Sequence, residues 1–315
     1  MIAPDKYRDL IDQDTWDFIE RTLEFYPADT ASAPIQQQRE IYNRLCAAFS
    51  VDYPESMKSE DFSISAEDRS INCRRYCTDF EESPRAQILY FHGGGYVVGG
   101  LHSHDSFCAE ICHATGLPLT AVDYRLAPEH HFPADLNDAI SAYRHLMDNS
   151  FLPVILLGDS AGGNIAAALA HASRRERRQP IGQILVYPTL GNDFGFGSYL
   201  EHANAPMLTT EDMLFYAKMR TKGDLDQWNE KELSPLNDAD FTNLPRTTVF
   251  AAQCDPLRDD GERYCEKINQ AGGQAAFVEE IGLPHTYLLA RHCVDRARNA
   301  FKNIVTALMA MEKSV

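Results

Sequence analysis

The sequence predicts an α/β fold: a mostly parallel sheet of eight strands with helices on both faces. Strand and helix patterns alternate from about residue 60 onward, which is the pattern that crossover connections between parallel strands produce. Two glycine-rich turns, at residues 93–95 and 158–163, each follow an apolar strand. The chain has 315 residues and is 44% hydrophobic, so it can bury a core of the size that such a sheet needs.

Eight strands and five helices are expected in this alternating region. The strands are predicted near residues 62–65, 72–77, 86–91, 118–122, 154–158, 182–187, 247–253 and 275–280. The helices are predicted near residues 104–115, 133–149, 161–177, 260–271 and 294–312. The chain has no internal repeat and no low-complexity segment.

Two regions stand outside the alternation. Residues 1–50 give helical patterns only, with two groups of apolar residues at helical spacing. These groups are Trp16, Ile19 and Leu23, and Ile41, Leu45 and Phe49. Residues 199–235 interrupt the sheet pattern, and Thr209-Thr210-Glu211-Asp212 opens a helix there. We therefore divide the chain into N-terminal helices at 1–50 and a main domain at 51–315 that carries an insertion at about 199–235.

Ser160 lies in a tight turn between a predicted buried strand and a predicted helix. The apolar run 153–157 precedes Gly158-Asp159-Ser160-Ala161-Gly162, and a stretch of mostly small residues follows at 163–169. Small residues let the chain fold back sharply, and they leave the serine exposed at the edge of the sheet. This strand–turn–helix context is the one in which a G-x-S-x-G motif forms a nucleophile elbow.

A second turn, Gly93-Gly94-Gly95, follows His92 at the end of the predicted strand 86–91. Three consecutive glycines let the backbone point its N–H groups at a bound oxygen atom. Together with the N–H of Ala161, they can form an oxyanion hole. The alternative is a flexible or phosphate-cradling loop, but the Lys-Ser/Thr pair of a P-loop does not follow. We expect His92 to anchor the glycine loop.

A serine nucleophile needs a histidine base and a carboxylate that orients it, and position selects among the 11 histidines. In this type of fold the carboxylate and then the histidine follow the serine, on loops after successive strands. Asp255 leaves the predicted strand 247–253, and His285 leaves the predicted strand 275–280. His292 lies two helical turns further on and is interpreted as a polar residue of a helix.

With these motifs the chain resembles the hormone-sensitive-lipase-like (family IV) carboxylesterases of the α/β-hydrolase superfamily, and among them the bacterial acetyl esterases. The matching motifs occur in the family's order, from about residue 60 to the C-terminus. They are His92-Gly93-Gly94-Gly95, Asp123-Tyr124-Arg125-Leu126-Ala127-Pro128-Glu129, Gly158-Asp159-Ser160-Ala161-Gly162-Gly163-Asn164, Asp255-Pro256-Leu257-Arg258-Asp259 and Pro284-His285. Tyr287 stands where the family often has Phe, which is a mild departure.

The resemblance implies an α/β-hydrolase fold in which residues 1–50 and 199–235 pack together as a helical cap above the active site. The implied catalytic triad is Ser160, Asp255 and His285. The implied oxyanion donors are the N–H groups of Gly94, Gly95 and Ala161. The alternative for the cap is an extra layer of surface helices without substrate contact. Apolar side chains that can wall a confined acyl pocket are Tyr96, Tyr187, Met207, Phe215 and Leu257.

The net charge of −17 argues against nucleic-acid and anionic-membrane partners, both of which need basic patches. No run of 18 apolar residues predicts a transmembrane helix, and the N-terminus lacks the apolar core of a signal peptide. Eight scattered cysteines are typical of free thiols in a reducing compartment. We therefore expect a cytoplasmic protein. The basic run at 174–178 is expected at a solvated helix end.

His104, Cys108 and Cys112 fall at i, i+4 and i+8 on one predicted helix. Three ligands spread over two helical turns converge poorly on a tetrahedral ion, so we interpret the two thiols as packing residues. No metal or organic cofactor is expected. A homodimer is compatible with the sequence.

These observations predict a serine carboxylesterase that hydrolyses a small-molecule ester with a short acyl chain through an acyl-enzyme intermediate. One alternative is a longer-chain lipase or an amidase with the same triad, because fold and triad do not fix the leaving group. The other is a regulatory or binding protein on a hydrolase scaffold. Turnover of a graded series of p-nitrophenyl esters distinguishes these hypotheses.

Overall fold

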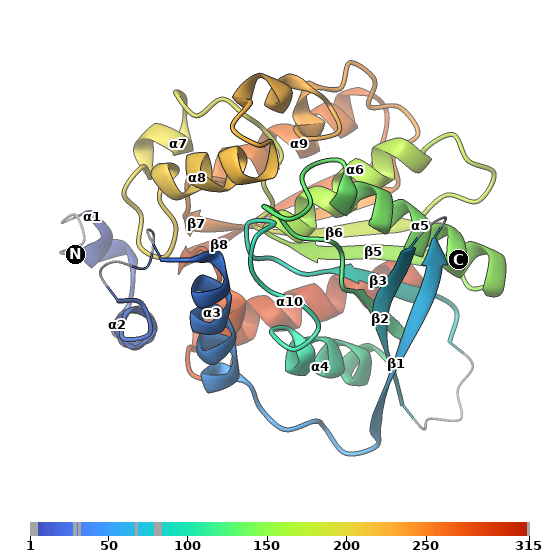
Figure 1. Ribbon diagram of the computed structural model, residues 1–315, viewed down its shortest axis with the longest axis horizontal. Coiled ribbons are helices and arrows are strands. Elements are labelled where there is room, and N and C mark those ends of the chain that lie inside the picture. The colour runs from blue at the N-terminus through green and yellow to red at the C-terminus, as the bar shows by residue number, and fades with distance from the viewer. Residues whose placement is uncertain (1–5, 28–29, 31–32, 67–68, 79–83, 314–315) are drawn as a thin grey trace.

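The computed structural model describes the chain except for residues 1–5, 28–29, 31–32, 67–68, 79–83 and 314–315. Within the described residues the strands form one eight-stranded sheet in the order β1-β2-β4-β3-β5-β6-β7-β8 (Figure 1). The strands are β1 (Met57–Ala66), β2 (Arg69–Thr78), β3 (Gln87–Phe91), β4 (Leu119–Val122), β5 (Val154–Asp159), β6 (Gly182–Val186), β7 (Arg246–Cys254) and β8 (Ala275–Pro284). β2 pairs antiparallel with β1 and with β4, and all other neighbours are parallel. The predicted mostly parallel sheet is confirmed.

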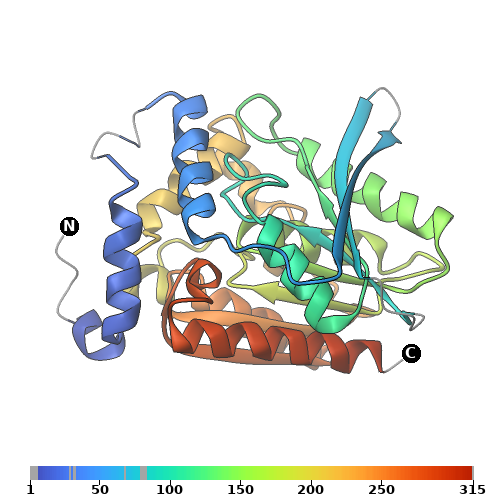
Figure 2. The ribbon, with the colours of Figure 1, turned by 90° about the horizontal axis from the view of Figure 1, so that it is seen from below.

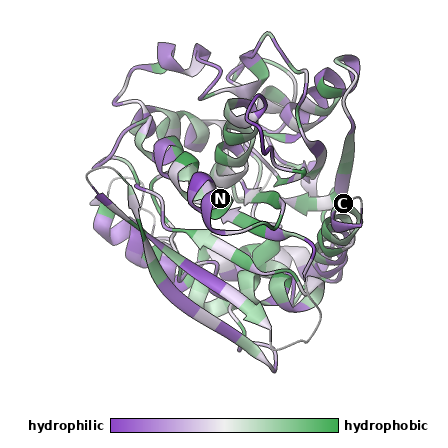
Figure 3. Ribbon diagram, turned by 90° about the vertical axis from the view of Figure 1, so that its right-hand side faces the viewer, coloured by the Kyte–Doolittle hydropathy of each residue, from purple (hydrophilic) through white to green (hydrophobic). Residues whose placement is uncertain are grey.

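The first two strands are longer than the predicted spans 62–65 and 72–77. They form a hairpin that is paired over its whole length, whereas only residues 73–76 of β2 pair with β4, and most side chains of β1 are exposed. Figure 3 shows the hairpin in largely hydrophilic colours beside the hydrophobic central strands. The prediction was too short because a strand with little buried surface carries little hydrophobic periodicity.

Five helices cover the two faces of the sheet, as predicted: α4 (Asp105–Thr115), α5 (Ala134–Asn149), α6 (Ala161–Ser173), α9 (Arg258–Gln270) and α10 (Asp295–Glu312). Alternate residues of the central strands point to opposite faces, so the sheet separates two hydrophobic cores. One core packs beneath α4 and α10, and the other packs beneath α5, α6 and α9. No helix in the described part of the chain is long and apolar enough to span a membrane.

Helix α6 ends at Ser173, four residues before the predicted end at 177. Arg174 caps it and is only 7% exposed, because its guanidinium lies 2.7 Å from the carboxylate of Asp238. The expectation of a solvated helix end is therefore wrong for Arg174. The sequence around Arg174 does not indicate this pair, because Asp238 lies 64 residues further along the chain.

The N-terminal helices are α1 (Lys6–Leu10), α2 (Gln13–Leu23) and α3 (Ile35–Phe49). They lie together at one end of the sheet, beside the end of α10 (Figure 2). Ile19, Ile41, Leu45 and Phe49 are buried, as their helical spacing predicts. Leu23 is 48% exposed, so the predicted apolar face is wrong there, because α2 ends at that residue.

The insertion contains α7 (Ser198–Glu201), α8 (Thr210–Arg220) and the short 3₁₀ helices η2 (Leu225–Asn229) and η3 (Pro235–Asn237). Thr209 caps α8: its hydroxyl accepts a hydrogen bond from the N–H of Asp212, whose carboxylate accepts one from the N–H of Thr209. The helix start predicted at 209–212 is confirmed. In Figure 1, α7 and α8 lie above the carboxyl ends of β7 and β8.

Candidate functional site

Ser160 lies in a strained turn between β5 and α6. Its backbone has φ 53° and ψ −118°, outside the regions that L-residues favour. Glycines make the turn possible. A Cβ at Gly158 would lie 2.3 Å from the carbonyl oxygen of Gly162, and one at Gly162 would lie 2.0 Å from that of Phe91. The turn leaves Ser160 partly exposed at the carboxyl edge of the sheet, and α6 begins at the next residue.

The side chains of Ser160, His285 and Asp255 form a continuous hydrogen-bonded chain. The Oγ of Ser160 lies 2.9 Å from Nε2 of His285, and Nδ1 of His285 lies 2.6 Å from Oδ2 of Asp255. Asp255 follows β7 and His285 follows β8, so the ends of three parallel strands bring the three side chains together. Asp255 is fully buried, and its Oδ1 accepts a hydrogen bond from the N–H of Leu257. With the Nδ1 proton directed at Asp255, Nε2 can accept the proton of Ser160.

The glycine loop after β3 lies against the Ser160 turn. Gly94 has φ 121° and Gly95 has φ 60°, which are backbone conformations that favour glycine. A Cβ at Gly94 would lie 2.1 Å from the carbonyl oxygen of Val98. Within the described residues, no acceptor is hydrogen-bonded to the N–H of Gly94, Gly95 or Ala161. These N–H groups are therefore available to a bound oxygen atom.

The carboxylate of Asp159 fixes the glycine loop to the strand that carries Ser160. Its Oδ1 accepts hydrogen bonds from the hydroxyl of Tyr90 at 2.6 Å and from the N–H of Gly93 at 3.0 Å. Burial acts to raise the pKa of Asp159, but the neighbouring His104 and the hydrogen bond from Tyr90 hold it below its ordinary value. The loop is thereby fixed by an ionised carboxylate.

His92 also fixes the loop, as its position predicts. Its Nδ1 lies 2.6 Å from the carbonyl oxygen of Gly93, and its ring stacks on that of Tyr124 at 4.3 Å. Burial, and then the nearby His104, lower the pKa of His92 to about 4. A neutral imidazole at neutral pH donates from Nδ1 to this carbonyl and so holds the loop without adding charge.

Three of the predicted pocket residues lie near the candidate triad or in the core around it. The ring centroid of Tyr187 lies 4.6 Å from that of His285. Leu257, two residues after Asp255, is buried in a small apolar cluster between the insertion and the core. Met207 is half-buried and packs against the core beneath α10. Of these three, Tyr187 is in ring contact with the candidate base.

The other two predicted pocket residues are Phe215 and Tyr96, and near them lies Tyr216, which the sequence analysis did not single out. Phe215 of α8 is half-buried beside Tyr216, and Tyr96 is buried beneath the guanidinium of Arg220, 3.8 Å from it. The ring of Tyr216 rests on Gly95, because a Cβ added to Gly95 would lie only 2.3 Å from Cδ1 of the Tyr216 ring. Tyr216 was missed because it shows its relation to the glycine loop only once α8 is placed. Its position beside Phe215 on a predicted helix was the one available signal.

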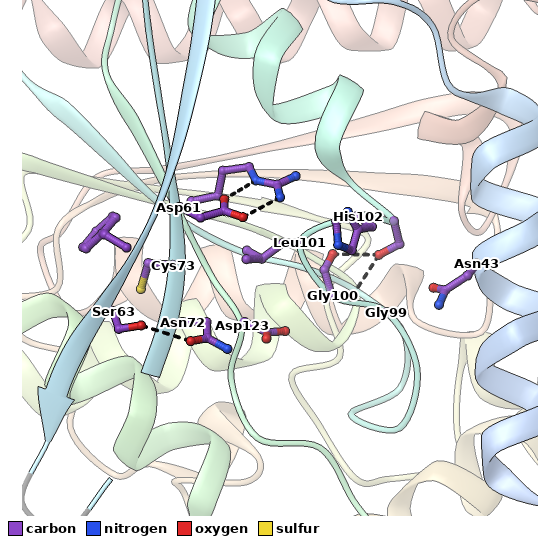
Figure 4. Close-up of a pocket in the computed structure, with 13 residues that line it drawn as sticks. Asn43, Asp61, Ser63, Asn72, Cys73, Gly99, Gly100, Leu101, His102 and Asp123 are labelled. Atoms are coloured by element: carbon purple, nitrogen blue, oxygen red, sulfur yellow. Dashed lines mark hydrogen bonds and ion pairs between the residues drawn. The ribbon is translucent and has the colours of Figure 1, made fainter. Parts of the chain in front are cut away.

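A polar groove of about 440 Å³ lies beside the glycine loop, between α3 and the β1–β2 hairpin (Figure 4). Its walls include the carboxylate of Asp123, the amides of Asn43 and Asn72, and the segment 99–103. The residues of the hydrogen-bonded chain do not line it, and neither do Gly94, Gly95 or Ala161. The groove is therefore separate from the candidate active site.

The sequence places His104, Cys108 and Cys112 on one helix, but in the structure only the two cysteines lie within α4. His104 is the N-cap residue that precedes this helix. Its Nδ1 lies 2.8 Å from the hydroxyl of Ser103, and its Nε2 lies 3.5 Å from Asp159. Both thiols are buried in the core beneath α4, and burial raises their pKa values. In the part of the chain that the structure describes, no group of three His, Cys, Asp or Glu side chains could hold a metal ion.

Comparison with known sequences agrees with this architecture. The model of a family described as having the α/β-hydrolase fold matches residues 88–289. The chain is 31% identical to an ethyl acetate hydrolase of Pseudomonas putida over 231 residues, which cover 71% of this chain and 72% of the relative. It is 34% identical to the esterase LipI of Mycobacterium tuberculosis over 270 residues, covering 81% and 82% of the two chains.

The fold is also shared with solved structures. A hyperthermophilic esterase from the archaeon Pyrobaculum calidifontis superposes with a TM-score of 0.89 and 27% sequence identity. The superposition covers 96% of this chain and 99% of that one.

Proposed function

The chain belongs to the α/β-hydrolase family, in its hormone-sensitive-lipase-like carboxylesterase branch, and we propose that it hydrolyses short-chain acyl esters with Ser160 as nucleophile. The observation that carries this proposal is the hydrogen-bonded chain from Asp255 through His285 to Ser160, with links of 2.6 and 2.9 Å. A serine hydroxyl becomes a nucleophile at neutral pH only when such a base accepts its proton.

In the proposed mechanism, Oγ of Ser160 attacks the ester carbonyl carbon while its proton passes to Nε2 of His285. Asp255 orients the imidazole and stabilises the imidazolium that forms. The carbonyl oxygen becomes an oxyanion, which the N–H groups of Gly94, Gly95 and Ala161 stabilise. His285 then donates its proton to the leaving alcohol, which gives an acyl-serine. Water, deprotonated by His285, attacks this ester and releases the carboxylic acid and free Ser160.

A short acyl chain is supported by two aromatic side chains, one beside the candidate base and one over the glycine loop. Tyr187 contacts the ring of His285, and Tyr216 covers Gly95. Bulky rigid rings close to a nucleophile shorten the space available to an acyl chain. The ethyl acetate hydrolase among the relatives is named for a substrate of this size.

We further propose that the helices at 1–50 and 199–235 act as a cap over this site. Arg39 of α3 supports the idea, because its guanidinium donates to the carbonyl oxygens of Val97 and Ala127 and lies 2.6 Å from the carboxylate of Glu129. Tyr216 of α8 approaches the same loop from the insertion.

We also propose a cytoplasmic location for the protein. All eight cysteines are free thiols in the structure, and free thiols are typical of proteins in a reducing compartment.

The substrate class is tested with p-nitrophenyl esters from acetate to dodecanoate, together with p-nitroacetanilide. We expect kcat/KM to be highest for acetate or butyrate and to fall steeply beyond about eight carbons, with far slower anilide cleavage. A preference for long chains would replace the short-acyl proposal with a lipase. Preference for the anilide would make the protein an amidase.

A further inference from the structure

Arg220, the last residue of α8, is a buried cation placed between the insertion and the core. Its side chain is 1% exposed, and its Nε lies 2.7 Å from Oδ2 of Asp135 on α5, which is also buried. Its Nη1 donates to Oδ1 of Asn164 at 2.9 Å. Its guanidinium carbon lies 3.8 Å from the ring centroid of Tyr96. One side chain therefore joins four separate segments.

Stability alone does not account for this arrangement. A buried ion pair contributes little net stability, because desolvation of both charges offsets their attraction. Burial of Arg220 also lowers the stability of the fold, since its Nη2 has no hydrogen-bond partner within the described residues. Among the neutral side chains that it contacts, Asn164 accepts a hydrogen bond and Tyr96 is the nearest ring, whereas the rings of Phe132 and Trp228 lie farther away, at 5.5 and 5.6 Å. Asn164 and Tyr96 therefore indicate what the guanidinium positions.

Tyr96 directly follows the candidate donor Gly95, and Asn164 lies three residues after the candidate donor Ala161. Tyr96 is the residue after the glycines, in the left-handed conformation with φ 66°. Asn164 lies in the first turn of α6, and its N–H donates to the carbonyl oxygen of Ser160 at 3.1 Å. Its side-chain amide donates to the carbonyl oxygens of Thr189 and Leu233 at 2.8 Å, so Arg220 completes its hydrogen bonds. Both contacts of Arg220 are thus with side chains whose residues lie within three positions of a candidate donor.

The two segments of the candidate oxyanion hole are joined twice. On the side of the sheet, the Asp159 carboxylate accepts a hydrogen bond from the N–H of Gly93. On the side of the insertion, Arg220 contacts Tyr96 and Asn164. In the glycine loop the candidate donors Gly94 and Gly95 lie between Gly93 and Tyr96. In the other segment the candidate donor Ala161 lies between Asp159 and Asn164. An oxyanion hole built from two segments works only if their separation is fixed to within about 0.5 Å.

We propose that Arg220 is a positioning residue, through which the cap helix α8 holds the glycine loop and the start of α6 at the separation needed for oxyanion stabilisation. This inference rests on the proposed esterase function. It makes the insertion part of the catalytic apparatus rather than only a wall of the substrate pocket. Arg220 acts in the transition state without touching the substrate.

The test compares Arg220→Lys and Arg220→Met with the wild type, using p-nitrophenyl acetate. Lysine keeps a positive charge beside Asp135. It lacks the planar guanidinium with which arginine bonds Asn164 and at the same time stacks on the ring of Tyr96. We expect kcat to fall by roughly 10-fold to 100-fold in folded protein, while KM stays within about threefold. The rate constant for inactivation by diethyl p-nitrophenyl phosphate should fall by a similar factor, since that adduct also needs the oxyanion donors.

Arg174→Met is the matched control. Arg174 is likewise buried and paired with a buried aspartate, Asp238, but at the opposite end of α6. This variant should lose thermal stability and keep kcat. Thermal melting and circular dichroism establish which variants are folded.

A folded Arg220 variant with kcat within about threefold of the wild type would overturn the proposal. Unfolding of both Arg220 variants would also overturn it, since Arg220 would then be a residue of stability. Failure of the proposed function has a different signature: either the wild type does not hydrolyse esters, or Ser160→Ala retains turnover. The two failures are therefore distinguishable.

Discussion

The hydroxyl of Tyr7 in α1 lies 3.0 Å from Nδ1 of His202, which directly follows α7 in the insertion. Both side chains are buried. The Nε2 of His202 lies 3.2 Å from Nη1 of Arg258, which follows the candidate triad carboxylate, Asp255, by three residues. The first helix of the chain therefore contacts the insertion and, through it, the start of α9, three residues after a member of the candidate triad. Tyr7 also belongs to the hydrophobic core beneath α10.

Deletion of residues 1–45 tests the role of these helices. Because Tyr7, Phe18, Ile19 and Leu45 belong to the same core as the sheet, we expect the truncated protein to expose apolar surface, melt at a lower temperature and aggregate. Any folded fraction should have a higher KM for short esters, since the pocket is opened. Size-exclusion chromatography, thermal melting and ester kinetics provide the measurements. A soluble truncation with unchanged kcat and KM would show that these helices are only an added layer.

Replacement of His285 by alanine should reduce kcat by roughly 10⁶, as loss of the histidine does in subtilisin, with little loss of secondary structure. His292→Ala is the control on the same segment. Its imidazole is 44% exposed and lies 2.9 Å from the carboxylate of Glu110, away from Ser160. We expect near-normal kcat there. Substantial turnover in His285→Ala would refute the assignment of the base.

Acid should destabilise the protein as the pH falls from about 6.5 to about 4. Burial lowers the pKa values of His92, His171 and His202 to about 4, whereas the unfolded chain binds these protons near pH 6.5. Their stability contribution is therefore present above pH 6.5 and is lost on acidification. Asp260 acts in the opposite direction, because burial raises its pKa to about 6 and its contribution is lost as the pH rises through that value.

The measurement is the melting temperature between pH 7 and pH 4.5, in the wild type and in His171→Gln. His171 bonds Asp238 through Nδ1 at 2.9 Å, and glutamine keeps a donor there without a titrating group. We expect the melting temperature of the variant to fall less steeply with acid than that of the wild type. Identical pH profiles would show that His171 does not titrate in this range.

Tyr216→Ala should extend the range of acyl chains. Removal of the ring above Gly95 opens space beside the glycine loop, so kcat/KM for octanoate should rise relative to that for acetate by about tenfold. Tyr216→Phe keeps the ring and serves as the control, with an unchanged preference. If both variants keep the wild-type chain-length profile, Tyr216 does not bound the acyl pocket.

The sequence was most informative where geometry depends on contiguous residues. The central strands, the two glycine turns and the capping box at Thr209 and Asp212 are local patterns, and the structure has them within a few residues of the predicted positions, whereas β1 begins five residues before its predicted start at 62. The grouping of Ser160, Asp255 and His285 followed from their positions at the carboxyl ends of three parallel strands, β5, β7 and β8. Their catalytic roles stay a prediction until the variants are measured.

The sequence was least informative where a polar residue is buried by distant partners. Arg220 and Arg174 both stand at helix ends, where a cation is ordinarily solvated and complements the helix dipole. Their partners Asp135 and Asp238 are 85 and 64 residues away in the chain. The Arg220 pair, like the contact of Tyr216 with Gly95, exists only after the insertion folds back on the core. No local pattern encodes that docking.

The central claim, that Ser160 is the nucleophile, is tested most directly by reaction with a fluorophosphonate followed by peptide mass spectrometry. The proposed mechanism predicts one phosphonyl group per chain, on Ser160, with loss of ester turnover in proportion to labelling. Ser160→Ala should take up no label, stay folded and lose roughly 10⁶ in kcat. Label on another residue that tracks the loss of activity, or undiminished turnover by folded Ser160→Ala, would contradict the claim.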